Sequence, residues 1–204
     1  MSNRGYFGVL MALFVVLFAV LAVAPREPVT WAMENAVAVL FVIGLWVTRR
    51  WFRFSRSAYV MMFSFLALHE VGAHYTYSHV PYDQTVHALL GFSPDAVMGW
   101  QRNQYDRFLH LLYGMLLVLP LSEVCREWGG LRRLGAALFA FSLILASSLL
   151  YELIEWGAAV VLGDGSTAFL GTQGDPWDAQ KDMALATVGA LATLLIAALV
   201  RRVR

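Results

Sequence analysis

Nine ionisable side chains lie within stretches of sequence that are otherwise strongly apolar. A charged side chain at the centre of a bilayer costs about 2.5–3.5 kcal/mol on insertion scales, so such residues are first considered functional. They come from four segments of the chain: His69, Glu70, His74, Asp106, His110, Glu152, Glu155, Asp178 and Asp182. Each group falls near the same membrane face, which predicts one polar cluster at a shared depth.

Helical spacing places several of these side chains on common faces. The pairs that are four residues apart are Asp106 with His110, Glu70 with His74, and Asp178 with Asp182. Residues four apart are neighbours on a helix surface. Ser148, Glu152 and Glu155 form a further stripe at spacings of four and three, and Tyr151 lies one turn from Glu155.

Carboxylates and imidazoles that project inward from facing helices are typical of metal sites in helical bundles. Mixed nitrogen and oxygen ligands suit zinc, iron or manganese better than calcium. We therefore predict one divalent metal ion, with the ligands His110, Glu155, Asp178 and Asp182. The predicted catalytic residues are Asp106, His110, Glu152 and Glu155, with His74 or Glu70 as an acid or base.

Several of these residues also have a purely structural interpretation. Asp106 and Asp178 could each serve the start of a helix, and His69 is better explained as a packing histidine than as a ligand. Glu70 could pair with an imidazole or with Arg107. Glu152 and Glu155 are hardest to explain as structure, because two acids on one face in lipid repel each other unless they are protonated or bridged.

The elements that must position these residues are membrane-spanning helices. Apolar residues make up 59% of the 204 positions and charged residues 14%, whereas a soluble domain carries about 25% charged residues. Stretches near the roughly 20 residues needed to cross a bilayer occur at 6–24, 31–47, 58–74, 106–123, 134–161 and 178–200. These stretches predict an all-α, polytopic membrane protein, with a six-helix transmembrane bundle as a single domain over residues 1–204.

Three other observations limit the class of protein. The first stretch is too long for the core of a signal peptide, so we expect a retained helix. The lone cysteine, Cys125, excludes an internal disulfide and zinc sites with paired thiolates. No basic patch is interleaved with aromatic residues, so nucleic acid is not expected as a partner.

The 15 Lys and Arg residues divide unevenly between the two sides of this six-span arrangement. Arg4, Arg49, Arg50, Arg53, Arg56, Arg126, Arg132, Arg133, Arg201, Arg202 and Arg204 fall on one side. Only Arg26, Arg102, Arg107 and Lys181 fall on the other side or at its boundary. Because loops rich in Lys and Arg stay in the cytoplasm, we predict that both termini are cytoplasmic and that the 75–105 and 162–177 connections are external.

The two external connections carry helix-start signals. Ser93 followed by Pro94 predicts a short interfacial helix from 94 to about 101 within the 75–105 connection. The 162–177 connection is glycine-rich at 163–166, and its last residues, Asp175-Pro176-Trp177-Asp178, resemble the N-terminal cap of a helix.

Four motifs resemble the YjdF-type bacterial inner-membrane proteins, a family without an assigned reaction. They are His74-Tyr75-Thr76-Tyr77, Tyr105-Asp106-Arg107 with His110, Tyr151-Glu152-Leu153-Ile154-Glu155-Trp156, and the run from Phe169 to Asp178 that contains Gly-Thr-Gln-Gly-Asp-Pro-Trp-Asp. Within these motifs we expect Tyr105, Arg107, Gln173, Asp175 and Trp177 to bind the substrate. The resemblance implies a multi-pass protein of the bacterial inner membrane.

The sequence is also similar, more distantly, to the VanZ-like proteins, whose pattern maps onto Asp106, Arg107 and His110, then the acids at 152 and 155, then Asp178 or Asp182. Those proteins are linked to glycopeptide resistance and the cell envelope, which by analogy implies an envelope role. Glu155 stands where that pattern often has glutamine.

Three functions remain open on this basis. The first is a metal-dependent enzyme that acts on a lipid or a lipid-linked envelope substrate at the outer leaflet. The second is a small transporter or proton relay, and the third is a scaffold or binding protein in which the polar cluster only holds the helices together. In each case membrane lipid is a partner, and the oligomeric state stays open.

Overall fold

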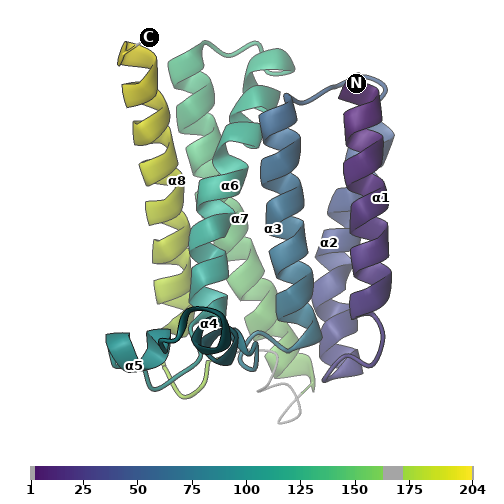
Figure 1. Cartoon of the computed structure of the whole chain (residues 1–204). Coiled ribbons are helices and arrows are strands. Elements are labelled where there is room, and N and C mark those ends of the chain that lie inside the picture. The colour runs from purple at the N-terminus through teal and green to yellow at the C-terminus, as the bar shows by residue number, and fades with distance from the viewer. Residues whose placement is uncertain (1–2, 163–171, 204) are drawn as a thin grey trace.

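The computed structural model describes residues 3–162 and 172–203, and within these ranges all the regular elements are α-helices (Figure 1). The helices are α1 (Asn3–Leu21), α2 (Pro28–Thr48), α3 (Arg56–His74), α4 (Tyr82–Leu90), α5 (Pro94–Met98), α6 (Tyr105–Glu127), α7 (Arg133–Leu162) and α8 (Asp178–Val203). The prediction of an all-α protein is thus confirmed.

Six of these helices are long and form a bundle, while α4 and α5 lie at one end of it (Figure 1). Each of the six apolar stretches corresponds to one long helix, although the first stretch runs past the end of α1. By length and composition, α2, α6, α7 and α8 can each cross a membrane, and α1 holds the shorter apolar helix Gly5–Leu21. Helix α3 carries polar residues such as His69 and Glu70 and is not among these four helices.

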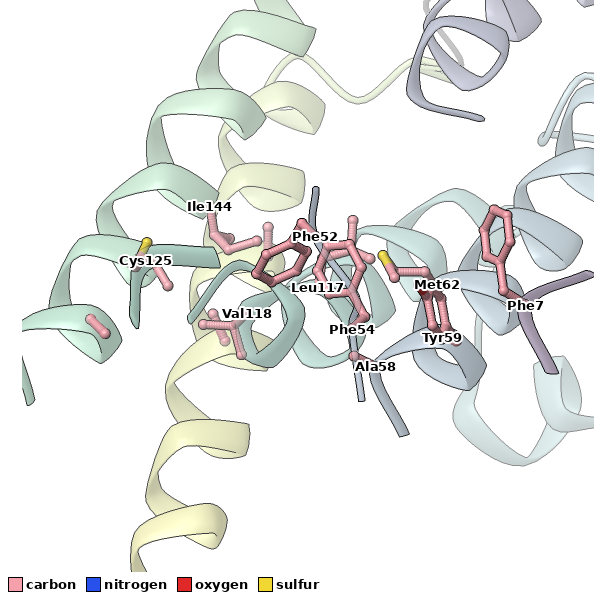
Figure 2. Packing of buried hydrophobic residues seen from close by; sticks show 14 residues of the cluster. Phe7, Phe52, Phe54, Ala58, Tyr59, Met62, Leu117, Val118, Cys125 and Ile144 are labelled. Atoms are coloured by element: carbon pink, nitrogen blue, oxygen red, sulfur yellow. The ribbon is translucent and has the colours of Figure 1, made fainter. Parts of the chain in front are cut away.

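The largest apolar core joins the helices toward the end that holds both termini (Figure 1). Figure 2 shows aromatic and aliphatic side chains from α1, α3, α6, α7 and the α2–α3 connection meeting there, with Val118 and Ile144 fully buried. The start of α3 is attached to α6 by Glu123, whose carboxylate accepts hydrogen bonds from the Ser55 amide (2.9 Å) and hydroxyl (2.5 Å). The Ser55 hydroxyl also caps α3 by accepting from the Ala58 amide at 3.1 Å.

Helices α6 and α8 approach each other most closely, because two glycines leave room for the facing backbone. A Cβ atom added at Gly114 would lie 1.9 Å from the Ala186 carbonyl oxygen, and one added at Gly189 would lie 2.1 Å from the Leu111 carbonyl oxygen. Small residues at such positions are typical of tightly packed membrane helices. The Thr193 hydroxyl adds a hydrogen bond to the Met115 carbonyl at 3.1 Å.

The 75–105 connection contains two short helices rather than one. The predicted helix exists as α5, with Ser93 as its cap, but it ends at Met98 because Gly99 adopts a left-handed conformation (φ 67°). Helix α4 was not predicted. Asp83 of α4 joins the two helices, since its carboxylate accepts from the Ser93 hydroxyl (2.8 Å) and the Asp95 amide (2.9 Å). Apolar side chains of both helices are exposed, as expected for helices at a membrane interface: Leu89, Leu90, Val97 and Met98.

We expect Gly114→Ala and Gly189→Ala to destabilise the protein. In both variants the new methyl group meets backbone atoms of the partner helix, which cannot rotate away, so α6 and α8 must separate. Overpacking of this kind costs about 1–3 kcal/mol. Thermal unfolding in a mild detergent should show a lower melting temperature for both variants.

Gly44→Ala provides the matched control, because nothing lies within 4 Å of a Cβ atom at this helical position. Alanine favours a helix over glycine, so this variant should melt at the same or a slightly higher temperature. An equal loss of stability in all three variants would contradict the proposed role of the close approach.

Candidate functional site

Five helices bring acidic residues and imidazoles to the end of the bundle where α4 and α5 lie (Figure 1). The contributing residues are Glu34 on α2, His69 and Glu70 on α3, Asp106 and His110 on α6, Glu152 and Glu155 on α7, and Asp178 and Asp182 on α8. Most of them are buried inside the bundle, where a charge is costly.

The register between α6 and α8 explains why three of these residues meet. Gly114 contacts Ala186, and one helical turn before each of them lie His110 and Asp182. Both helices run in the same direction, so the close approach carries His110 and Asp182 to the same level. Asp106 lies one further turn toward the start of α6, and one of its carboxylate oxygens is 3.6 Å from the His110 Nε2 atom.

Asp106, His110 and Asp182 form a group that can hold a metal ion. One ligand atom from each lies within 4.8 Å of the other two, and the Glu152 Oε1 atom lies 3.7 Å from the His110 Nε2 atom. Ligands on a tetrahedral ion with bonds of about 2.1 Å are about 3.4 Å apart, so a small contraction would complete the site. One carboxylate oxygen each of Asp182 and Glu152 is buried with no hydrogen-bond partner among the described residues. These two oxygens are therefore available as metal ligands.

Glu155 lies beside this group rather than in it. The charges of Asp106, Glu152 and Asp182 all act on its carboxyl group, as does that of Glu34 on α2. It is not among the three residues whose ligand atoms come together. Glu155 therefore lies near these carboxylates but outside the three-residue group.

Asp178, also predicted to be a ligand, is instead held by two arginines. Arg102 donates to both of its carboxylate oxygens, and Arg107 donates to the Oδ1 atom at 3.1 Å. The Asp178 side chain is only 3% exposed, so these ion pairs occupy it. The VanZ-like pattern left Asp178 and Asp182 as alternatives, and the geometry favours Asp182 as the ligand.

The two predicted site residues on α3, Glu70 and His74, lie apart from this group, as does the neighbouring His69. His69 is hydrogen-bonded through Nδ1 to the Tyr77 hydroxyl (2.6 Å) and stacks on Phe65, which fits a packing role. His74 bonds through Nδ1 to the Leu21 carbonyl (2.8 Å) and so attaches α3 to the end of α1. Glu70 is fully buried, and its carboxylate has no hydrogen-bond partner among the described residues, neither an imidazole nor Arg107.

Glu34 belongs to the cluster but was not predicted. Its carboxylate accepts a hydrogen bond from the Tyr151 hydroxyl at 2.5 Å, and the side chain is 3% exposed. The signal was present in the sequence, because Glu34 and Asn35 are polar residues inside the apolar 31–47 stretch. The hydrogen bond between Tyr151 and Glu34 joins α7 to α2, and Tyr151 directly precedes Glu152 in the sequence.

The predicted substrate-binding residues mostly hold the outer connections together. Tyr105 is buried and donates to the Leu68 carbonyl (2.8 Å). The Gln173 side chain bonds to the amide (2.9 Å) and carbonyl (3.1 Å) of Asn103, and Arg107 also pairs with Asp175. Trp177 is 63% exposed. The glycine-rich 163–166 segment and the 169–171 part of the fourth motif lie outside the described residues.

Asp175 is the centre of an ion network at the end of the bundle where α4 and α5 lie. Lys181 donates to its carboxylate at 2.5 Å, the Trp177 amide donates at 3.0 Å, and Arg107 also pairs with it. These donors, with the Lys181 ammonium group as the largest contribution, hold the pKa of the Asp175 carboxyl well below its usual range. The network closes the start of α8 onto α6.

We expect Asp175→Asn to lower the melting temperature by a few degrees at pH 7. Because the pKa of Asp175 is lower in the folded than in the unfolded chain, its stabilisation is complete above the unfolded value of about 4. That stabilisation is lost as the pH falls from there toward the folded pKa. Melting curves should therefore separate the variant from the wild type at pH 5–8, and the difference should narrow below about pH 4.

Glu27→Gln removes an exposed acid outside the network and serves as the control. It should melt like the wild type throughout this range. A difference between wild type and Asp175→Asn that grows as the pH falls would contradict the assignment.

Comparisons with known proteins agree with the motifs. The chain matches, over residues 6–203, the family described as "Predicted membrane protein (DUF2238)". It is 35% identical over 179 residues to the inner membrane protein YjdF of Escherichia coli (strain K12), which covers 86% of this chain and 81% of the relative. No solved structure matches the chain. The YjdF-type resemblance is thereby confirmed, the VanZ-like resemblance stays an expectation, and the chain belongs to the DUF2238 family of membrane proteins.

Proposed function

We propose that all six long helices cross the bacterial inner membrane and that both termini are cytoplasmic. The relative in Escherichia coli is an inner membrane protein. The two ends of the chain lie at one end of the bundle, opposite α4 and α5 (Figure 1). The eleven basic residues on the predicted cytoplasmic side give the direction, since such residues are retained there. The polar cluster then lies toward the outer leaflet.

Reporter fusions test this topology. Fusions after Arg53, Arg132 and Arg201 should report the cytoplasm, and fusions after Asp95 and Gly174 should report the outside. Each pair of successive sites is separated by one crossing helix, so successive fusions must report opposite sides of the membrane. Two successive sites that report the same side would remove the six-span arrangement.

We propose further that the cluster binds a divalent metal ion and that the protein is an enzyme acting on a lipid or lipid-linked envelope substrate at the outer leaflet. The observation that carries this proposal is the convergence of Asp106, His110 and Asp182 from two helices. Zinc, iron or manganese fits this mixed donor set. A bound ion would polarise a phosphoryl or acyl oxygen of the substrate or activate a water molecule.

The neighbouring residues have definite places in such a reaction. Glu152 lies next to His110 and can complete the ligand set. Glu155 lies beside the group and would transfer the proton, as a carboxylate close to a reacting centre can. On the outer side of α7, Leu153, Ile154 and Trp156 are exposed, so a lipid can approach the acids of α7 from within the bilayer.

A proton relay is the second candidate, and a specific arrangement favours it. Tyr151 bonds to Glu34, and Tyr77 bonds to His69, each across two elements. The charges of Glu34, Asp106 and Glu155 all act on Tyr77. Chains of tyrosine hydroxyls, carboxylates and imidazoles conduct protons in membrane proteins, so the same residues could serve transport without a metal ion.

Elemental analysis of protein purified in a mild detergent tests the metal site. The wild type should carry about one zinc, iron or manganese ion per chain. His110→Asn and Asp182→Asn should each lose nearly all of it, because each removes a ligand. Glu155→Gln should keep the metal, but this variant should fail to restore the phenotype of a deletion strain. His87→Ala, at an exposed position of α4, is the control and should keep both.

The other functions predict different results. If the wild type holds no metal while Glu34→Gln and Tyr151→Phe abolish proton movement in vesicles, the relay is correct. If the variants fail to accumulate while a double variant with apolar replacements of matching shape stays active, the cluster is structural, because replacing both buried partners can preserve stability.

A further inference from the structure

A cavity of about 510 Å³ lies at the other end of the bundle, where both termini are found. It is bounded by the start of α1, the end of α2 and the connection between α2 and α3. Its lining combines the arginines Arg49, Arg50 and Arg53 with the aromatic residues Phe7, Trp46 and Tyr59. Asn3 and Gly8 complete the lining. This site is separate from the acidic cluster and is independent of the function proposed for it.

The positive charge of this cavity is not neutralised within the described part of the chain. All ion pairs of the described residues lie at the other end of the bundle, and none includes Arg49, Arg50 or Arg53. The acids at this end are Glu123, whose carboxylate binds Ser55, and Glu127, which is exposed. The cavity therefore has an excess of positive charge available to an anion.

Arg49 is oriented by the aromatic wall of the cavity. Its guanidinium carbon lies 3.5 Å from the centre of the Trp46 ring, and the group also donates to the Trp46 carbonyl. A guanidinium packed over an aromatic ring is restricted in its orientation, and an arginine can form two parallel hydrogen bonds to a phosphate. Trp46 and the exposed Trp51 are the kind of residue that marks the level of lipid headgroups.

A narrow apolar crevice of about 30 Å³ continues from the cavity toward the membrane interior. Phe7 and Tyr59 line both spaces, and the crevice is otherwise bordered by Leu10, Met11, Phe14, Val42, Leu45, Met62, Phe63 and Leu66. The crevice exists because α1 and α2 each pack on α3 but approach one another mainly through side chains. For example, the ring centroids of Phe7 and Trp46 lie 6.2 Å apart. An acyl chain that follows it would replace contacts with bulk lipid by contacts with protein.

We propose that this cavity binds an anionic glycerophospholipid of the cytoplasmic leaflet. Arg49, Arg50 and Arg53 hold the phosphate, and the first methylene groups of one acyl chain lie along the crevice between α1 and α2. Basic pockets between membrane helices on the cytoplasmic side are suited to such headgroups. The apolar crevice beneath the charges distinguishes a lipid from a free phosphate ion.

Binding of fluorescent phosphatidylglycerol to the full chain in a mild detergent tests the proposal. Each arginine near a headgroup contributes roughly a fivefold gain in affinity, so Arg50→Gln/Arg53→Gln should bind about 25-fold more weakly. Both side chains are exposed, so folding should be unaffected, which melting curves verify. Arg132→Gln/Arg133→Gln removes the same charge from the α6–α7 connection at the same end and should bind like the wild type.

Competition experiments identify the ligand. Unlabelled phosphatidylglycerol should displace the probe, whereas phosphatidylcholine and inorganic phosphate should not at the same concentration. Equal loss of binding in the two double variants would overturn the site, because the effect would then be general surface charge. Displacement by inorganic phosphate as strong as by the lipid would overturn the role of the crevice and leave a simple phosphate site.

Discussion

The close packing of α6 on α8 is the contact on which the candidate site depends. Gly114 and Gly189 let the two backbones meet, and this contact sets the level of the side chains one and two turns before it. His110 and Asp182 face each other for this reason, and Asp106 joins them from the next turn of α6. The candidate metal ligands are therefore positioned by residues that carry no chemistry of their own.

At the end of the bundle where α4 and α5 lie, some acidic residues are paired with arginines and others are not. Arg102 and Arg107 pair with Asp178, which lies one turn from Asp182 on the same helix. Asp182 keeps a buried oxygen without a hydrogen-bond partner among the described residues, and so does Glu152. Because arginine stays charged at all accessible pH values, Asp178 is held in ion pairs, whereas Asp182 and Glu152 each keep an oxygen that can bind a cation.

The sequence predicted the features that follow from helical period and composition. Spacing alone paired Asp106 with His110, and the apolar stretches predicted the six long helices. It did not predict α4, because its cap residue Pro81 makes no side-chain capping bond and the helix is short. The choice between Asp178 and Asp182 as ligand depends on the path of the 75–105 connection, which tertiary contacts determine. Glu34 was recoverable from the sequence, since it is an acid in an apolar stretch.

The balance of charge in the cluster indicates why a purely structural role is the weaker explanation. After Asp175 and Asp178 are paired with cations, five buried or partly buried carboxyl groups remain on four helices, with His110 as the imidazole beside them: Glu34, Asp106, Glu152, Glu155 and Asp182. Carboxylates this close in a medium of low dielectric cannot all be charged. The repulsion is relieved only by bound protons or a bound cation, and a network that served packing alone would gain stability by replacing these acids with apolar side chains.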